Sequence, residues 1–194
     1  MTVTIQLVRH GKTKGNLEKR FTGGQTDDSL CIQGKEELNS FVSKNIYLNA
    51  DEVFSSPMKR CLETAETIFP EHKVYIIEEF RELDFGIFEN KKHEELNGNT
   101  DYQKWLDSDG KGDIPGGEKM DDFVKRTMVG FDKMISSIKD KGNKITATVH
   151  GGTIMAILFS LNGGNFYNYL CKNGCGYIFE YTIENKKILN IRKL

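Results

Sequence analysis

The alternation of strand-like and helical stretches constrains the fold of this chain more than any other feature. Four runs have the apolar or alternating pattern of strands, at 3–9, 53–54, 73–77 and 145–149. Four stretches carry apolar residues at helical spacing, at 33–47, 57–68, 120–138 and 153–161. Strands that are separated by helices form mostly parallel sheets, because a parallel pair needs a long crossover connection. We therefore predict an α/β fold, a three-layer α/β/α sandwich with a mixed, mostly parallel sheet.

The end of the chain and one helix start carry clear local signals. Ser56 is a good N-cap and Pro57 a good first helical residue, so a helix is expected to begin there. Residues 177–183 and 188–191 are predicted to pair as a closing hairpin across a short turn.

Residues 87–118 are the least regular part of the chain. Short helical pieces are expected near 93–96 and 102–106, and a Pro-Gly-Gly-Glu turn follows at 115–118. The chain has 194 residues, which is the length of one ordinary domain. We predict a single domain over 1–194, in which 87–118 forms an insert over the edge of the sheet where ligands bind.

Cationic or potentially cationic side chains follow three of the predicted strands. Arg9 and His10 come after the first strand, Arg60 lies one helical turn beyond the second, and His150 comes after the fourth. The carboxyl ends of parallel strands share one rim, and ligands bind there. Two predicted helix N-termini on the same rim would add free N–H groups and partial positive charge. This combination predicts a site for a phosphate dianion.

Each of these residues also has an explanation that involves no ligand. Arg60 could be a surface residue that pairs with Glu63 or Glu66, and His150 could be a core histidine with its hydrogen bonds satisfied. Their joint placement favours a shared site.

Composition excludes several classes of protein. The net charge is −1, which is not the electrostatic signature of a protein that coats nucleic acid or an anionic membrane. The first ten residues hold too short an apolar run for a secretion signal, and the block at 154–159 is far too short to span a bilayer. We expect a cytoplasmic protein whose four Cys are ordinary thiols. Nothing in the sequence indicates an oligomeric state.

Two short motifs imitate nucleotide and metal sites. The Gly-Lys-Thr at 11–13 follows a strand, but a P-loop needs glycine where Gln6 stands. The His-Glu-Glu at 93–95 resembles a zinc-protease helix, but the second histidine is replaced by Asn97. We therefore predict no metal and no other cofactor.

Four longer motifs occur in order along the chain. They are LVRHGKTKGN with RFTG at 7–16 and 20–23, SSPMKRCLETAE at 55–66, RELDFG at 81–86 and VHGG at 149–152. Together they resemble the histidine phosphatase superfamily, also called phosphoglycerate mutase-like. The resemblance runs from about residue 3 to the final hairpin.

The resemblance implies a catalytic role for five residues. His10 would be the nucleophile that forms a phosphohistidine, with its other ring nitrogen donating to a backbone carbonyl. Arg9 and Arg60 would clamp the phosphoryl oxygens, and His150 would add a donor as the cation. Glu82 would protonate the leaving oxygen and then activate water, a role for which Asp84 is the competitor.

Further residues would complete the phosphoryl site by the same resemblance. Asn16 would supply a neutral donor, and Thr22, Gly23 and Gly151 would contact the substrate. The roles of Lys12 and Lys14, which could rim the pocket or form a solvated charged face, stay open.

Three functions remain possible for such a site. The first is a phosphatase that hydrolyses a small phosphomonoester metabolite; the second is a bisphosphoglycerate-dependent phosphoglycerate mutase; the third is a phospho-ligand binder without activity. The short segment around 115–118 resembles small phosphatases such as α-ribazole phosphatase, and the five catalytic side chains are all present. We therefore favour the phosphatase.

Overall fold

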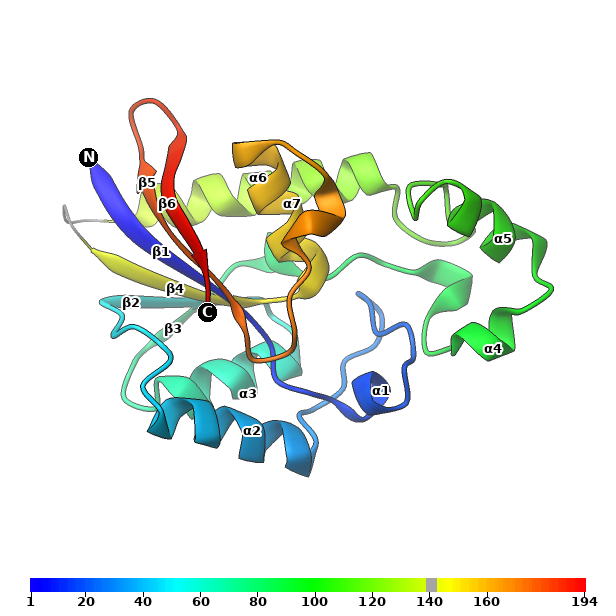
Figure 1. Cartoon of the computed structure of the whole chain (residues 1–194), viewed down its shortest axis with the longest axis horizontal. Helices are drawn as coiled ribbons and strands as arrows, with labels where there is room; N and C mark the ends of the chain where they lie inside the picture. The colour runs from blue at the N-terminus through cyan, green and yellow to red at the C-terminus, as the bar shows by residue number, and fades with distance from the viewer. Residues whose placement is uncertain (139–142) are drawn as a thin grey trace.

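The computed structural model describes residues 1–138 and 143–194, and within them six strands form one sheet (Figure 1). The strands are β1 (Thr2–Arg9), β2 (Glu52–Ser55), β3 (Val74–Ile76), β4 (Lys144–Val149), β5 (Gly176–Thr182) and β6 (Lys187–Lys193). Their order is β3-β2-β4-β1-β5-β6. The first four strands of that order are parallel, and β5 and β6 are antiparallel. The predicted mixed, mostly parallel sheet and the closing hairpin are confirmed.

Helices cover both faces of this sheet (Figure 1). α6 (Met120–Ser137) and α7 (Gly151–Asn162) lie on one face, and α2 (Ile32–Ser43) and α3 (Lys59–Ile68) lie on the other. The three-layer architecture is therefore also confirmed. None of the described helices combines the length and the apolar character that crossing a membrane requires.

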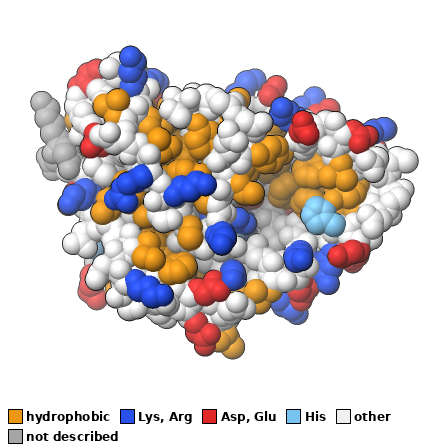
Figure 2. All heavy atoms as spheres, in the orientation of Figure 1, with side chains coloured by type: hydrophobic (Ala, Val, Ile, Leu, Met, Phe, Trp, Pro, Cys, Tyr) orange, Lys and Arg blue, Asp and Glu red, His pale blue; other side chains and the backbone are white. Residues whose placement is uncertain are grey.

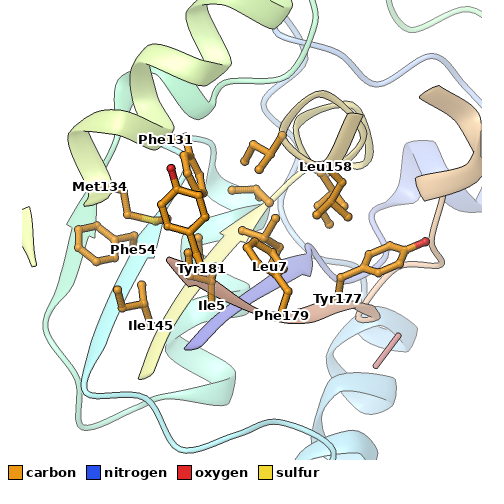
Figure 3. Packing of buried hydrophobic residues seen from close by; sticks show 14 of the residues in the cluster. Ile5, Leu7, Phe54, Phe131, Met134, Ile145, Leu158, Tyr177, Phe179 and Tyr181 are labelled. Carbon is orange, nitrogen blue, oxygen red and sulfur yellow. The ribbon is translucent and has the colours of Figure 1, made fainter. Parts of the chain in front are cut away.

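Side chains of β1 alternate between two hydrophobic clusters, one on each face. Ile5 and Leu7 are buried with Phe131 of α6 on one side (Figure 3). Val8 is buried on the other side with Leu38 of α2. Because both faces of the central strands are packed, their carboxyl ends hold the residues that follow on a rigid frame.

The start of α3 differs from the prediction. The N-cap is Met58 and the first helical residue is Lys59, so the expected start at Ser56 and Pro57 is wrong by two residues. The Ser56 hydroxyl lies 2.7 Å from Nε2 of His150. The side chain that was expected to cap the helix therefore contacts one of the predicted site residues.

Two other helix boundaries also differ. α2 ends at Ser43 rather than at 47, because Asn45 adopts a left-handed conformation with a φ of 53°. α7 begins at Gly151, two residues before the predicted start. α6 matches its prediction to within one residue, and the Gly142 that was expected to follow it lies outside the described residues.

The stretch 87–118 builds two short helices and a cluster of its own. α4 (His93–Leu96) and α5 (Thr100–Asp107) confirm the expected helical pieces and extend away from the sheet (Figure 1). The cluster is mostly aromatic and is made by Phe21, Phe85, Phe88, Leu96, Tyr102, Trp105 and Ile114. Two of its members, Phe21 and Phe85, come from the segments that carry the first and third motifs, so the cluster ties the stretch to them.

Candidate active site

The sheet register places the three motif-bearing strand ends side by side. Arg9 at the end of β1 is paired with Val149 at the end of β4, and Ser55 at the end of β2 is paired with Thr148. The rings of His10 and His150 therefore meet, with centroids 5.3 Å apart and planes at 64°. Residues that are distant in sequence converge on one rim, as the parallel strands predicted.

His10 is held as a neutral imidazole with one free nitrogen. Its side chain is buried, and Nδ1 lies 2.7 Å from the carbonyl oxygen of Gly11, to which it donates. This hydrogen bond fixes the tautomer and leaves the lone pair of Nε2 available. Burial, together with the positive charges of Arg60 and Arg9, holds the pKa of His10 well below its ordinary value. A neutral imidazole is the form that can attack phosphorus.

Arg60 is fully buried on α3 and donates three hydrogen bonds. Nε donates to Nδ1 of His150 at 3.2 Å, and the two terminal nitrogens donate to the carbonyl oxygens of Thr26 at 2.5 Å and Gly23 at 3.1 Å. A guanidinium has five N–H donors, so two are left after these three contacts. The alternative in which Arg60 is a surface residue is wrong.

Arg9 extends along the N-terminus of α7. One terminal nitrogen donates to the carbonyl oxygen of Cys171 at 2.7 Å. Its Nε is buried and finds no hydrogen-bond partner among the described residues. A Cβ on Gly151 would lie 3.4 Å from the guanidinium carbon, so the helix backbone passes directly against this side chain.

The two guanidinium groups form a positive site that no carboxylate of the described residues contacts directly. Neither Arg9 nor Arg60 makes an ion pair with a carboxylate in the part of the chain that the structure describes. Burying an unpaired charge is costly, so such charges in proteins normally meet an anion. A phosphoryl dianion would supply the missing negative charge.

His150 is neutral in this structure, whereas a cation was expected for its role as a donor to a phosphoryl group. Its Nδ1 accepts a hydrogen bond from Arg60, so the proton must be on Nε2, which then donates to the Ser56 hydroxyl. Burial and the charge of Arg60 hold the pKa of His150 well below its ordinary value. Sequence analysis did not identify Ser56 as a partner of this histidine.

Glu82 is the buried carboxyl of the site. Its two oxygens accept hydrogen bonds from the backbone N–H groups of Leu83 at 3.0 Å and Gly152 at 3.1 Å. A Cβ on Gly152 would lie 2.3 Å from Oε1 of Glu82, so only glycine allows this close approach. Burial raises the pKa of Glu82, although the two backbone donors act in the opposite direction. A carboxyl with a raised pKa is suited to give up a proton as a general acid.

Asp84, the competitor for this role, is occupied by contacts within its loop. Its Oδ1 accepts from the backbone N–H of Gly86 at 2.8 Å, and its Oδ2 accepts from Nε2 of Gln25 at 2.7 Å. The side chain is therefore used to shape the loop that carries Glu82.

Glu89 joins this loop to the segment that carries Thr22 and Gly23, and the sequence analysis missed it. Its carboxylate accepts from the backbone N–H groups of Gly23, Gln25 and Phe85 and from the Thr26 hydroxyl. The N–H of Gly23 therefore already has a partner, as its carbonyl has in Arg60. Thr22 donates its hydroxyl to the carbonyl oxygen of Arg20 at 3.4 Å.

Asn16 lies on α1 (Lys14–Leu17), a short helix that was not predicted. Its Oδ1 accepts from the backbone N–H of Thr13 at 3.0 Å and from Nδ2 of Asn173 at 3.2 Å. Its own Nδ2 donates to no group of the described residues, so this nitrogen is free to meet a ligand. Asn173 also donates to the carbonyl oxygen of His10 at 3.0 Å and so holds the β1 end in place.

Lys12 and Lys14 both have acidic partners. Nζ of Lys12 lies 2.6 Å from the carboxylate of Glu37, and Nζ of Lys14 lies 3.6 Å from that of Glu18. Neither lysine therefore offers an uncompensated charge as Arg9 and Arg60 do.

The depressed pKa values of both site histidines predict a loss of stability in acid. The unfolded chain binds protons near pH 6.5 where folded His10 and His150 do not. The stability that these histidines contribute is therefore present above pH 6.5 and lost as pH falls below it, by up to about 1.4 kcal/mol per pH unit for each ring. The raised pKa of Glu82 has the opposite sign and offsets one of the two rings at most. Urea unfolding should give a lower free energy of unfolding at pH 5.5 than at pH 7.5.

A substitution isolates the histidine contribution to this pH dependence. His150→Gln cannot be protonated, so its free energy of unfolding should change less between pH 7.5 and pH 5.5 than that of the wild type. An equal or higher stability of the wild type at pH 5.5 would contradict the pKa directions.

Comparison with known proteins adds three findings. A family model described as histidine phosphatase superfamily (branch 1) matches residues 5–193. A broad-specificity phosphatase of Saccharomyces cerevisiae is 27% identical in an alignment that covers 96% of this chain and 83% of that protein. The α-ribazole phosphatase of Shigella flexneri has a similar structure, with a TM-score of 0.82 and 22% identity over 100% of this chain and 96% of the other.

A phosphoglycerate mutase of Bacillus anthracis is nearly as similar in structure. Its TM-score is 0.81, with 22% identity over 100% of this chain and 92% of that one. At this level of identity both structural likenesses show the fold, and the fold is common to a phosphatase and a mutase. The choice between the two activities has to come from the site.

Proposed function

Because the chain belongs to the histidine phosphatase superfamily, we propose that it hydrolyses small phosphomonoesters through a phosphohistidine intermediate on His10. One observation carries the proposal. Neutral His10 has a free Nε2 and lies close to the guanidinium groups of Arg9 and Arg60, which have no carboxylate partner within the described chain. A phosphoryl group would neutralise those charges and present phosphorus to the imidazole. The relatives that are named as phosphatases support the same activity.

The reaction proceeds in two transfers. In the first, Nε2 of His10 attacks phosphorus, the bond to the ester oxygen breaks, and Glu82 gives its proton to the departing alcohol. In the second, the Glu82 carboxylate takes a proton from water while the water oxygen attacks phosphorus. Inorganic phosphate leaves and the neutral imidazole is restored.

The remaining residues of the site stabilise the charge on the phosphoryl oxygens. The free donors of Arg9 and Arg60 bind these oxygens, and their effect grows as negative charge spreads over them in the transition state. Nδ2 of Asn16 and the N-terminus of α7 at Gly151 add neutral donors. The hydroxyl of Thr22, the backbone of Gly23 and the Nε2–H of His150 can join them only by leaving their present partners.

Replacing Glu82 with glutamine tests the acid role. The amide cannot donate a proton to the leaving oxygen, so we expect kcat for an alkyl phosphate to fall by about 10² to 10⁴. An aryl phosphate, whose alcohol leaves without protonation, should lose much less in the first transfer. The measurement is a single-turnover rate for both esters.

Asp84→Asn provides the matched control for this variant. Asp84 shapes the same loop but does not donate to the ester in the proposed reaction. An Asp84→Asn enzyme that loses the alkyl ester selectively, while Glu82→Gln keeps it, would assign the acid to Asp84 instead.

One incubation separates hydrolysis from the other two functions. Purified protein is given 3-phosphoglycerate with and without a bisphosphoglycerate primer, and a generic aryl phosphate in parallel. Inorganic phosphate from the esters supports the proposal. Isomerised phosphoglycerate without inorganic phosphate would identify the protein as a mutase. If neither product forms, the result would favour a phospho-ligand binder without activity.

A further inference from the structure

An aromatic pocket adjoins the proposed general acid. A cavity of about 130 Å³ borders Glu82, and six of the twelve residues that line it are aromatic: Phe21, Phe85, Trp105, Phe123, Phe166 and Tyr167. Glu82 protonates the ester oxygen in the proposed reaction. The group attached to that oxygen, which departs as the alcohol, therefore faces this cavity.

The wall of the cavity is built from segments that are far apart in sequence. Phe21 belongs to the first motif, Trp105 to α5, and Phe166 to a 3-10 turn, η3 (Phe166–Tyr169). The ring centroid of Phe21 lies 5.6 Å from that of Trp105. The hydroxyl of Tyr167 donates to the carbonyl oxygen of Asp109 at 2.8 Å and fastens η3 to the end of α5. These contacts between separate segments hold the wall of the pocket in place.

The wall of the cavity is mostly apolar. Among the described residues that line the cavity, Glu82 is the one carboxylic acid, and none is Lys, Arg or His. A charged group on the alcohol would therefore meet no cationic side chain in this wall. Figure 2 shows a group of hydrophobic side chains on the part of the molecule that protrudes beyond the sheet.

The size of the cavity limits what it can hold. A cavity of roughly 150 Å³ lined by apolar side chains accommodates benzene in another protein. The cavity beside Glu82, at about 130 Å³, therefore suits one ring or a short branched chain. Removing such a group from water favours binding in proportion to its apolar area.

We propose that the substrates are phosphomonoesters of compact apolar alcohols, whose hydrocarbon part lies in this aromatic pocket while the phosphoryl group meets His10. This inference rests on the proposed phosphatase function and adds the class of alcohol to it. A polar triose alcohol would leave the aromatic wall uncovered, and an acidic one would meet no cation in that wall.

Two matched esters test the alcohol class. Benzyl phosphate and glycerol 3-phosphate are both esters of primary alcohols, so the chemical step is similar and the hydrocarbon part is the main difference. We expect kcat/KM for benzyl phosphate to exceed that for glycerol 3-phosphate by about tenfold or more, since one methylene in an apolar pocket can already change kcat/KM by that factor. Equal values, or a preference for glycerol 3-phosphate or 3-phosphoglycerate, would overturn the inference and leave the phosphatase function intact. Hydrolysis of none of these esters would instead refute the phosphatase function.

Variants of the wall locate the preference. Trp105→Ala and Phe166→Ala remove rings that come from two different elements, and each should lower kcat/KM for benzyl phosphate about tenfold more than for glycerol 3-phosphate. Leu106→Ala, next to Trp105 but 42% exposed and outside the wall, should leave the ratio of the two esters unchanged.

The two wall variants also separate specificity from folding. If Trp105→Ala damages the insert, kcat/KM should fall for both esters together and the melting temperature should drop. Phe166→Ala, at a residue that is only partly buried, then tests the pocket without that damage. A ratio that stays at the wild-type value in Phe166→Ala, with an unchanged melting temperature, would refute the pocket as the alcohol site.

Discussion

Replacing His10 with alanine is expected to abolish phosphate release while the protein stays folded. In the proposed reaction the imidazole is the group that bonds to phosphorus, and without it neither transfer can begin. Loss of a catalytic nucleophile lowers kcat by several orders of magnitude, about 10⁴-fold or more. The melting temperature should change little at neutral pH, because His10 lies beyond the end of β1 and outside the two main hydrophobic clusters. The measurements are steady-state phosphate release and a thermal melt.

His72→Ala is the matched control for this variant. His72 is an exposed histidine whose Nε2 lies 2.9 Å from the carbonyl oxygen of Ala50, and it takes no part in the site. Its loss should leave phosphate release near the wild-type rate. Activity retained in His10→Ala would contradict the assignment of the nucleophile.

Replacing Arg60 with alanine is expected to have the second-largest effect and to act in two ways. Removing a donor that binds charge developing in the transition state typically lowers the rate by about 10² to 10³. The carbonyl groups of Gly23 and Thr26 would also lose their donor, so the melting temperature should fall. kcat/KM and thermal melts of the purified variant measure both effects.

Two further variants separate these contributions. Arg60→Lys keeps the positive charge but cannot reproduce the three-way contact, so it should recover only part of the activity. Arg192→Ala on β6 removes an exposed arginine and should change neither quantity. A rise in KM with kcat unchanged in Arg60→Ala would show that Arg60 binds the substrate without stabilising the transition state.

The position of the site could be predicted from the sequence because it depends only on the strands being parallel. Any parallel arrangement of the runs at 3–9, 53–54 and 145–149 puts Arg9, His10 and His150 on one rim, whatever the details of side-chain packing. The register that pairs Arg9 with Val149 is the structural realisation of that rule. The resemblance of the four motifs suggested a role for each of these residues, and the family model matches nearly the whole chain, residues 5–193.

Partners that come together only in three dimensions could not be predicted. Ser56 reads as a helix cap in the sequence, yet its hydroxyl meets a histidine 94 positions away. Glu89 lies in the least regular stretch and joins two loops through four hydrogen bonds, for which no local pattern exists. Both depend on how separate segments approach each other.

The neutral state of His150 in this structure could not be predicted for a related reason. A sequence does not give the degree of burial, and burial next to Arg60 is what lowers the pKa of this ring. The requirement for glycine at Gly152 has the same origin, because the Glu82 carboxyl that would collide with a Cβ comes from a loop 70 residues earlier.

The most direct test of the account is to find the phosphoryl group on the protein during turnover. Enzyme mixed with a ³²P-labelled phosphomonoester is quenched in alkali within one turnover, where phosphohistidine survives, and the labelled peptide is identified. The account predicts acid-labile label on His10, and none in His10→Ala. Rapid phosphate release with no label on the protein, or label on another residue such as His150, would contradict it.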